Sequence, residues 1–338
     1  KINIRQFLFL MLCVPSILFQ VSCSDILDKH PTDKLTEATF WQTEKDALLA
    51  LTGVYHEGTQ ANGRYFPFWM KGTIIRFDLF ADNGNEKDDR LEYDGNLTSS
   101  HSFIENFWSA SYNKIGRCNN FLGNISKVDM DEVKKAELIA EVKFIRAFYY
   151  FWMSQYWGGV PLVTEVLDYD AANSISRSSK SEVVDFTLRE FSEAAADLPL
   201  MRPDNEYGRI TKGAALAMMG RLLMSEKRWD EASEVYNQII DLGIYSIDPR
   251  YKELFEVGGE KSPEVLLAFV LVENDYGDDI IKLCMPTAFG GWSQLNVFNN
   301  LVEEYEMIDG KTPEESPLFD INNPYDNRDP RLHMTVLI

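Results

Sequence analysis

The chain has 338 residues, with 33 lysines and arginines against 53 aspartates and glutamates, and a formal net charge of −20. Because 45% of its residues are hydrophobic and 13% are aromatic, it can bury a sizeable core and is not intrinsically disordered. The negative charge repels phosphate backbones and no basic run interrupts it, so we expect no nucleic-acid partner. The chain starts at Lys1 and stops at Ile338 in an apolar run, and we expect a C-terminally truncated fragment.

Residues 1–22 have the composition of a secretory signal, with basic residues first and an apolar stretch at residues 7–19. Cys23 follows directly, in the position of the lipid-acceptor cysteine of bacterial lipoproteins. Gln20 departs from that pattern, because leucine is typical there. The alternative is an ordinary signal with a chance cysteine nearby. The apolar stretch is too short to form a membrane-spanning helix.

The first amphipathic helix is expected at residues 43–58, opened by a capping box of Thr43 and Asp46. Residues 58–102 are rich in glycine, asparagine and aspartate with embedded aromatics, and predict a long irregular excursion with one strand at residues 73–80. Long loops in compact domains are usually functional or mobile.

Helices are expected next at residues 103–125 and 131–157, the second capped by Asp129 and Glu132. We assign the aromatic residues of the second helix to core packing, because they recur at intervals of three and four. Its expected buried stripe is Leu138, Val142, Ile145, Tyr149, Trp152 and Tyr156.

Further helices are expected from a Ser179 and Glu182 capping box to about Pro199, at residues 211–227 and at residues 229–242. Beyond them the pattern loosens. We expect a short buried strand at 264–270, a loop at 290–292, a short helix at 300–307 and a loop at 313–330.

A small residue in one helix, a second small residue twelve positions later and an aromatic four after that are typical of tetratricopeptide repeats. Gly220, Ala232 and Tyr236 meet this spacing. A second, interrupted copy comprises Ala147, Tyr150, Thr187, Phe191, Ala194 and Pro199. The sequence therefore predicts a mainly α fold, a tetratricopeptide-like superhelix with long irregular loops and a few short strands.

Motifs of catalysis are missing from the sequence: there is no nucleophile elbow, dinucleotide fingerprint or zinc-binding helix motif. The four histidines have no metal-ligand spacing. Asp275, Asp278 and Asp279 could surround calcium, but they do not follow the order of an EF-hand loop, and we interpret them as a solvated turn. We expect no catalytic residue, no metal site and no cofactor.

Aromatic, amide and arginine side chains gather in the loops instead. Flat aromatic faces against sugar C–H surfaces, with amides and arginine on the hydroxyls, are the elements of a glycan platform. The alternative is that these aromatic side chains simply cover the edges of the repeats. The candidate ligand-binding residues are Tyr65, Trp69, Arg76, Asn83, Asn96, Phe289, Trp292 and Gln294.

Several stretches of the chain together resemble the SusD/RagB family of nutrient-uptake lipoproteins. The longest reads AEVKFIRAFYYF at residues 140–151, followed by YWGGVPL at residues 156–162. The supporting stretches are CSDILD at 23–28, TFWQTE at 39–44, WSASYNKIGRCNN at 108–120, GRITKGAALA at 208–217, YEMIDG at 305–310 and NRDPR at 327–331.

The resemblance implies a lipid-anchored protein on the outer face of the outer membrane. Such proteins sit as a lid on a TonB-dependent, SusC-like transporter and deliver oligosaccharides to it, binding the ligand without hydrolysing it. It also implies three segments: a signal peptide at 1–22, an N-terminal helical-repeat region at 23–243 and an incomplete C-terminal region at 244–338. The ligand-binding regions it implies are residues 62–100 and 289–296.

Two other functions stay open from the residues alone, a secreted glycoside hydrolase and a repeat scaffold that binds only protein. The charge favours a neutral glycan over a uronate-rich one, unless local arginines offset it.

Overall fold

The computed structural model describes residues 40–56, 81–87, 98, 102–268, 270 and 280–337. Several predictions therefore lie outside the described residues. They are the signal at 1–22, the lipid acceptor Cys23, the strand at 73–80, the acidic run at 275–279 and the candidates Tyr65, Trp69, Arg76 and Asn96.

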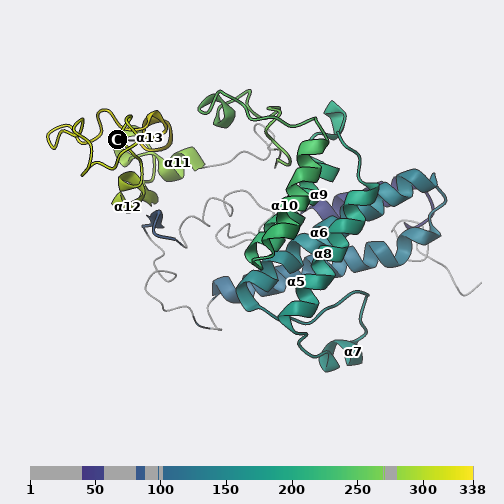
Figure 1. The fold of residues 1–338 in the computed structure, drawn as a ribbon. Helices are drawn as coiled ribbons and strands as arrows, with labels where there is room; N and C mark the ends of the chain where they lie inside the picture. Colours follow the sequence, from purple (N-terminus) through teal and green to yellow (C-terminus); the bar gives the residue numbers. More distant parts are fainter. Residues whose placement is uncertain are drawn as a thin grey trace, which may run out of the picture.

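The described part of the chain is built mainly from a bundle of helices (Figure 1). Its members are α3 (Glu44–Tyr55), α5 (Ser102–Asn124), α6 (Glu132–Trp157), α8 (Lys180–Asp197), α9 (Lys212–Ser225) and α10 (Trp229–Asp241). Helix α5 packs on α6, α6 on α8, α8 on α9 and α9 on α10. Each long helix thus contacts the next one along the chain, which is the packing of a helical repeat. The predicted mainly α architecture is confirmed.

The close approach of α9 and α10 depends on the small residue that the repeat spacing marked. A Cβ atom at Gly220 would lie 2.6 Å from Cε1 of Tyr236, so the ring occupies the space that a side chain would need. Ala232, the second small residue, is fully buried. Small residues at a crossing let helix backbones approach, and here an aromatic ring fills the gap between them.

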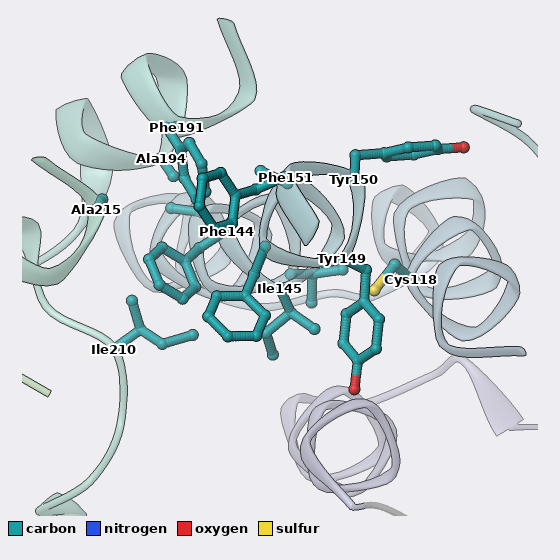
Figure 2. Close-up of a cluster of buried hydrophobic side chains, with 14 of the residues drawn as sticks. Cys118, Phe144, Ile145, Tyr149, Tyr150, Phe151, Phe191, Ala194, Ile210 and Ala215 are labelled. Carbon is teal, nitrogen blue, oxygen red and sulfur yellow. The ribbon is translucent and has the colours of Figure 1, made fainter. Parts of the chain in front are cut away.

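Helix α6 supplies more of the core than any other described helix, with side chains packed toward neighbours on several sides (Figure 2). Phe144, Tyr149 and Tyr150 are fully buried, and Phe191 of α8 packs edge-on against Phe144. The predicted stripe was wrong at its end, because Tyr156 is 46% exposed.

Helix starts follow the predicted capping chemistry with one exception. The Thr43 and Ser179 capping boxes are both formed, and Thr211 caps α9. Helix α6 is capped by Asp131, whose carboxylate accepts from the Lys134 backbone N–H, and the predicted cap at Asp129 was wrong. A capping side chain accepts from an N–H two or three residues further along the chain. Because α6 begins at Glu132, that N–H belongs to Lys134, which is within reach of Asp131 but lies five residues after Asp129.

Shorter elements complete the described residues. The 3₁₀ turns are η3 (Ile125–Lys127), η4 (Asp204–Glu206), η5 (Glu253–Phe255) and η6 (Thr287–Phe289). The short helices are α7 (Tyr169–Ser174), α11 (Ile280–Cys284), α12 (Asn299–Glu303) and α13 (Pro330–Thr335). Strands β1 (Gly84–Glu86) and β2 (Leu295–Val297) pair antiparallel, with α11 against β2. No helix in these ranges has the length and hydrophobicity that crossing a membrane requires.

Two predictions for the C-terminal part need correction. Residues 264–268 form turns and bends and not a strand, because an apolar run becomes a strand only where another strand pairs with it. Helix α12 ends at Glu303, earlier than predicted. The guanidinium group of Arg328 donates to the carbonyl oxygens of Val302 and Tyr305 and so takes over the acceptors at this helix end.

Candidate ligand-binding surface

Strands β1 and β2 join the two regions that the resemblance marked for ligand binding. Gly84 pairs with Val297 and Glu86 with Leu295. The backbone N–H of Phe298 donates to the Asn83 carbonyl at 2.9 Å, and that of Lys87 donates to the Gln294 carbonyl at 2.8 Å. The structure therefore places Asn83 and Gln294 on one two-stranded ribbon, although they are far apart in sequence.

The turn at residues 290–294 is held against the C-terminal end of α11. Backbone N–H groups of Trp292, Ser293 and Gln294 donate to the carbonyls of Lys282, Met285 and Leu283. Carbonyls at a helix end have no partner within the helix, so this turn satisfies them and is fixed by them.

Two glycines make that turn possible. Gly290 has a φ of +87°, in the left-handed region that favours glycine. A Cβ atom at Gly291 would lie 2.0 Å from the Met285 carbonyl oxygen, so no larger residue fits without moving the backbone. The Gly-Gly-Trp sequence, predicted only as a loop, thus presents Trp292 from a fixed turn.

The aromatic side chains of this turn face outward. Phe289 is 74% exposed and Trp292 is 48% exposed. The Nζ atom of Lys282 lies 5.9 Å from the centre of the Trp292 ring, in the range of a cation–π contact. Exposed rings beside an amide and an ammonium group can stack on a sugar ring and donate to its hydroxyl groups.

The ribbon also separates the candidates. In the antiparallel register Asn83 aligns with Phe298 and Gln294 with Lys87, so Asn83 and Gln294 lie at opposite ends. Four residues of strand span about 14 Å. Gln294, Trp292 and Phe289 lie in or next to the turn at one end of the ribbon, and a ligand that contacted both this turn and Asn83 would have to extend along the ribbon.

Two residues that the sequence did not single out belong to this surface. Lys282 contacts the Trp292 ring, and Val297 of β2 is 45% exposed. Neither carries a sequence signal, because a single lysine in a short apolar helix and a valine in a short strand are ordinary. The hydrogen bond from the Trp292 N–H to the Lys282 carbonyl places Lys282 beside the aromatic turn, and Val297 lies on the strand that continues from that turn.

The longest stretch that carries the family resemblance, residues 140–162, instead builds the scaffold. Arg146, buried in α6, forms an ion pair with Glu190 of α8 at 2.7 Å and donates to Asn119 of α5 at 2.7 Å. Burial raises the pKa of Glu190, while Arg146 opposes that rise. Asn119 and the Tyr150 hydroxyl hydrogen-bond with the backbone of Val163. These contacts hold the extended segment after α6 against the bundle.

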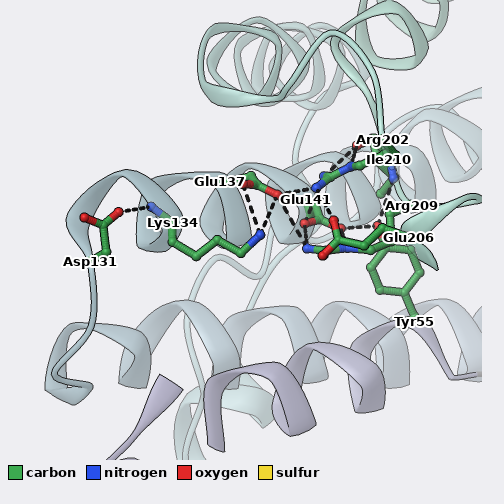
Figure 3. A network of polar contacts seen from close by, with 9 residues as sticks. All are labelled: Tyr55, Asp131, Lys134, Glu137, Glu141, Arg202, Glu206, Arg209 and Ile210. Carbon is green, nitrogen blue, oxygen red and sulfur yellow. Dashed lines mark hydrogen bonds and ion pairs between the residues drawn. The ribbon is translucent and has the colours of Figure 1, made fainter. Parts of the chain in front are cut away.

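A second polar network ties α3, α6 and the loop before α9 together (Figure 3). Glu141 is fully buried and pairs with Arg202, at 3.1 Å, and with Arg209. The Tyr55 hydroxyl donates to Glu141 at 2.5 Å and accepts from the Ile210 backbone N–H at 3.1 Å. Burial and the neighbouring Glu141 raise the pKa of Tyr55 well above its usual range, so the hydroxyl stays protonated.

This second network also includes Glu137. Burial acts to raise its pKa, but hydrogen bonds from Arg202 and Lys134 bring the pKa below its ordinary value. Through the bonds of Arg209 to Glu141 and of the Ile210 N–H to Tyr55, the Gly-Arg-Ile-Thr stretch at residues 208–211 holds the loop before α9 against the bundle.

Within the described ranges, no group of three or more histidine, cysteine, aspartate or glutamate side chains is arranged to hold a metal ion.

Comparisons with known proteins agree with this architecture. The SusD-like family described as "Starch-binding associating with outer membrane" matches residues 26–224. A SusD-like carbohydrate binding protein from Bacteroides fragilis NCTC 9343 is 34% identical in sequence and superposes with a TM-score of 0.80, over 88% of this chain and 60% of its own. A second SusD-like protein from that organism is 26% identical, with a TM-score of 0.76 over 90% of this chain and 62% of its own.

Among curated proteins, SusD-like protein P25 of Formosa agariphila is 25% identical over 275 residues, which are 77% of this chain and 50% of the relative. The chain thus spans about half the length of this relative and 60% of the first solved structure.

Proposed function

The chain belongs to the SusD-like family, and from this membership we propose that it captures a glycan at the cell surface and delivers it to a TonB-dependent, SusC-like transporter. In this proposal the protein binds its ligand and does not cleave it. It is held by lipid on Cys23 at the outer face of the outer membrane, and its ligand-binding residues lie on the β1–β2 ribbon and the turn beside it.

One observation carries the proposal: the exposed rings of Phe289 and Trp292 stand on a turn that α11 and two glycines hold in place. A preordered aromatic surface loses little entropy when a sugar ring stacks on it. The name of the Bacteroides fragilis relative, a carbohydrate binding protein, supports the same ligand class.

The binding test uses a full-length protein and isothermal titration with a panel of neutral oligosaccharides. Trp292→Ala removes the fixed ring, and we expect affinity for the bound glycan to fall about tenfold, equivalent to about 1.4 kcal/mol. Trp229→Ala is the matched control, because Trp229 is 55% exposed but lies at the start of α10, away from the ribbon. Equal affinity in both variants would rule out Trp292 as a ligand contact.

Two outcomes would contradict the function itself. Steady release of reducing ends by the purified protein would make it a hydrolase. Co-purification with a barrel partner, together with no binding to any glycan, would make it a protein-binding scaffold.

The lipid anchor and the transporter have separate tests. Cys23→Ala should move the protein from the membrane fraction to the soluble fraction, and unchanged fractionation would refute the anchor. Pull-down of the lipidated, full-length protein from detergent-solubilised outer membranes should recover a TonB-dependent barrel in a stoichiometric amount, and recovery of none would refute the delivery role.

A further inference from the structure

The surface shared by the end of α6 and α9 lacks acidic residues. Residues 147–157 of α6 contain no charged side chain, and α9 (Lys212–Ser225) has no acidic one, its two charges being Lys212 and Arg221. The two helices are in contact. In a chain with 53 acidic residues, this is a local departure from the overall charge.

Arg221 is the exposed cation of this surface. Its Cζ atom lies 5.4 Å from the centre of the Trp152 ring, and the side chain is exposed. The ion pairs formed within the described ranges do not include Arg221, whereas Arg202, Arg209 and Arg228 all pair with carboxylates. A guanidinium on an aromatic ring, with its donors toward solvent, is a ready partner for an anionic group.

Tyr156 extends the aromatic surface next to Arg221. Its ring stacks on Trp152 with 6.2 Å between centres and an angle of 23°, and 46% of it is exposed. Burial raises the pKa of Tyr156 to about 12 and raises that of Tyr236, and in both the charge of Arg221 opposes the rise. The guanidinium is therefore close to two phenol groups that stay protonated and can donate.

We propose that Trp152, Tyr156 and Arg221 form a second glycan contact, one that selects sugars carrying a carboxylate. The exposed Tyr156 ring would stack on the C–H face of a uronic acid, and Arg221 would donate two parallel hydrogen bonds to its carboxylate. The proposal rests on the glycan-binding function proposed above. It adds a second binding surface, separate from the Trp292 turn, and names the class of sugar that this surface binds.

The net charge does not oppose this site. At physiological ionic strength charges are screened over about 8 Å, so a bound carboxylate responds chiefly to the groups beside it. Residues 147–157 of α6 and helix α9 contribute aromatic rings and one exposed cation beside it.

The test compares Arg221→Gln with Arg189→Gln in the full-length protein. Arg189 is the matched control: it is also exposed, and its Cζ atom also lies 5.4 Å above a ring, but that ring, Phe186, is only 6% exposed. Both substitutions remove one positive charge. The ligands are hexamers of galacturonate, glucuronate and mannuronate, each with its methyl-esterified form, and one neutral glycan that the protein binds.

We expect Arg221→Gln to weaken binding of at least one free-acid hexamer about fivefold, the scale of an exposed charge pair. Arg189→Gln should leave that affinity unchanged, and the methyl esters should bind Arg221→Gln and the original protein equally. Higher salt should reduce the difference in free-acid affinity between the original protein and Arg221→Gln. Tyr156→Ala should weaken both the free acid and its ester.

Three results would overturn the proposal. One is equal affinity of the Arg221→Gln and original proteins for every free-acid hexamer. Another is binding of the neutral glycan with no binding of any uronate, which leaves the general function intact. The third is a loss in Arg221→Gln of a co-purifying protein only, which would make this surface a protein interface. Absence of binding to every sugar would refute the general function as well.

Discussion

Removal of one oxygen atom at Tyr55 should destabilise the whole bundle. Tyr55→Phe keeps the ring in place but deletes the hydroxyl that donates to Glu141 and accepts from the Ile210 N–H (Figure 3). Glu141 and Ile210 are both fully buried. Water cannot replace the lost partner easily, so both groups lose hydrogen bonds that folding had formed.

The size of the effect follows from those two losses. A hydrogen bond to a buried carboxylate contributes about 1.5–3 kcal/mol, and a buried N–H left without a partner costs about 1–3 kcal/mol. The two overlap, because Arg202 and Arg209 still hold Glu141. We expect the free energy of unfolding to fall by about 3 kcal/mol and Tm by about 6–12 °C.

Urea unfolding followed by tryptophan fluorescence measures this change, with calorimetry for Tm. Tyr169→Phe is the control, since Tyr169 is 82% exposed, and it should change the free energy of unfolding by less than about 0.5 kcal/mol. A loss below about 1 kcal/mol in Tyr55→Phe would refute the argument. A double-mutant cycle with Glu141→Gln would then show whether the hydroxyl and carboxylate are coupled at all.

Three further changes test other parts of the structure. Gly220→Ala should lower the free energy of unfolding by about 1–3 kcal/mol, because its Cβ would lie 2.6 Å from the Tyr236 ring. Burial raises the pKa of the Cys118 thiol to about 12, so a thiol reagent at pH 8 should modify the exposed Cys284 and reach Cys118 only on unfolding. Hydrogen bonds from Arg331 lower the Asp329 pKa to about 2, so its stabilising contribution should be complete above pH 4 and lost as the pH falls toward 2.

Each of these has a control and a result that would contradict it. Gly116→Ala should stabilise the protein by about 0.5–1 kcal/mol, because nothing lies within 4 Å of its Cβ position, and equal losses at both glycines would contradict the packing argument. Mass spectrometry reads the thiol labelling, and equal labelling rates would show that Cys118 is accessible. Carbon-detected NMR titration reads the Asp329 pKa, and a value near 3.8 that Arg331→Gln does not change would refute the pairing.

The sequence by itself determined the six long helices of the bundle and their order. Capping boxes at Thr43 and Ser179, and the periodic apolar positions of α6 and α8, are local signals that act within one or two turns of chain. The spacing of Gly220 and Tyr236 also marked a helix crossing, because a repeat unit packs on its neighbour in sequence. The errors occurred at helix ends: the cap of α6 was predicted at Asp129 but lies at Asp131, and Tyr156 was predicted to be buried but is exposed.

Tertiary structure alone decided which side chains share a surface. The pairing of β1 with β2 brings residues 83–87 against residues 294–298, and strand pairing across such a distance leaves no periodic trace in either segment. The cation beside Trp152 and Tyr156 comes from α9, three helices later in the chain. Local patterns fix the elements because hydrogen bonds within a helix are local, but a binding surface forms only where the folded chain brings distant residues together.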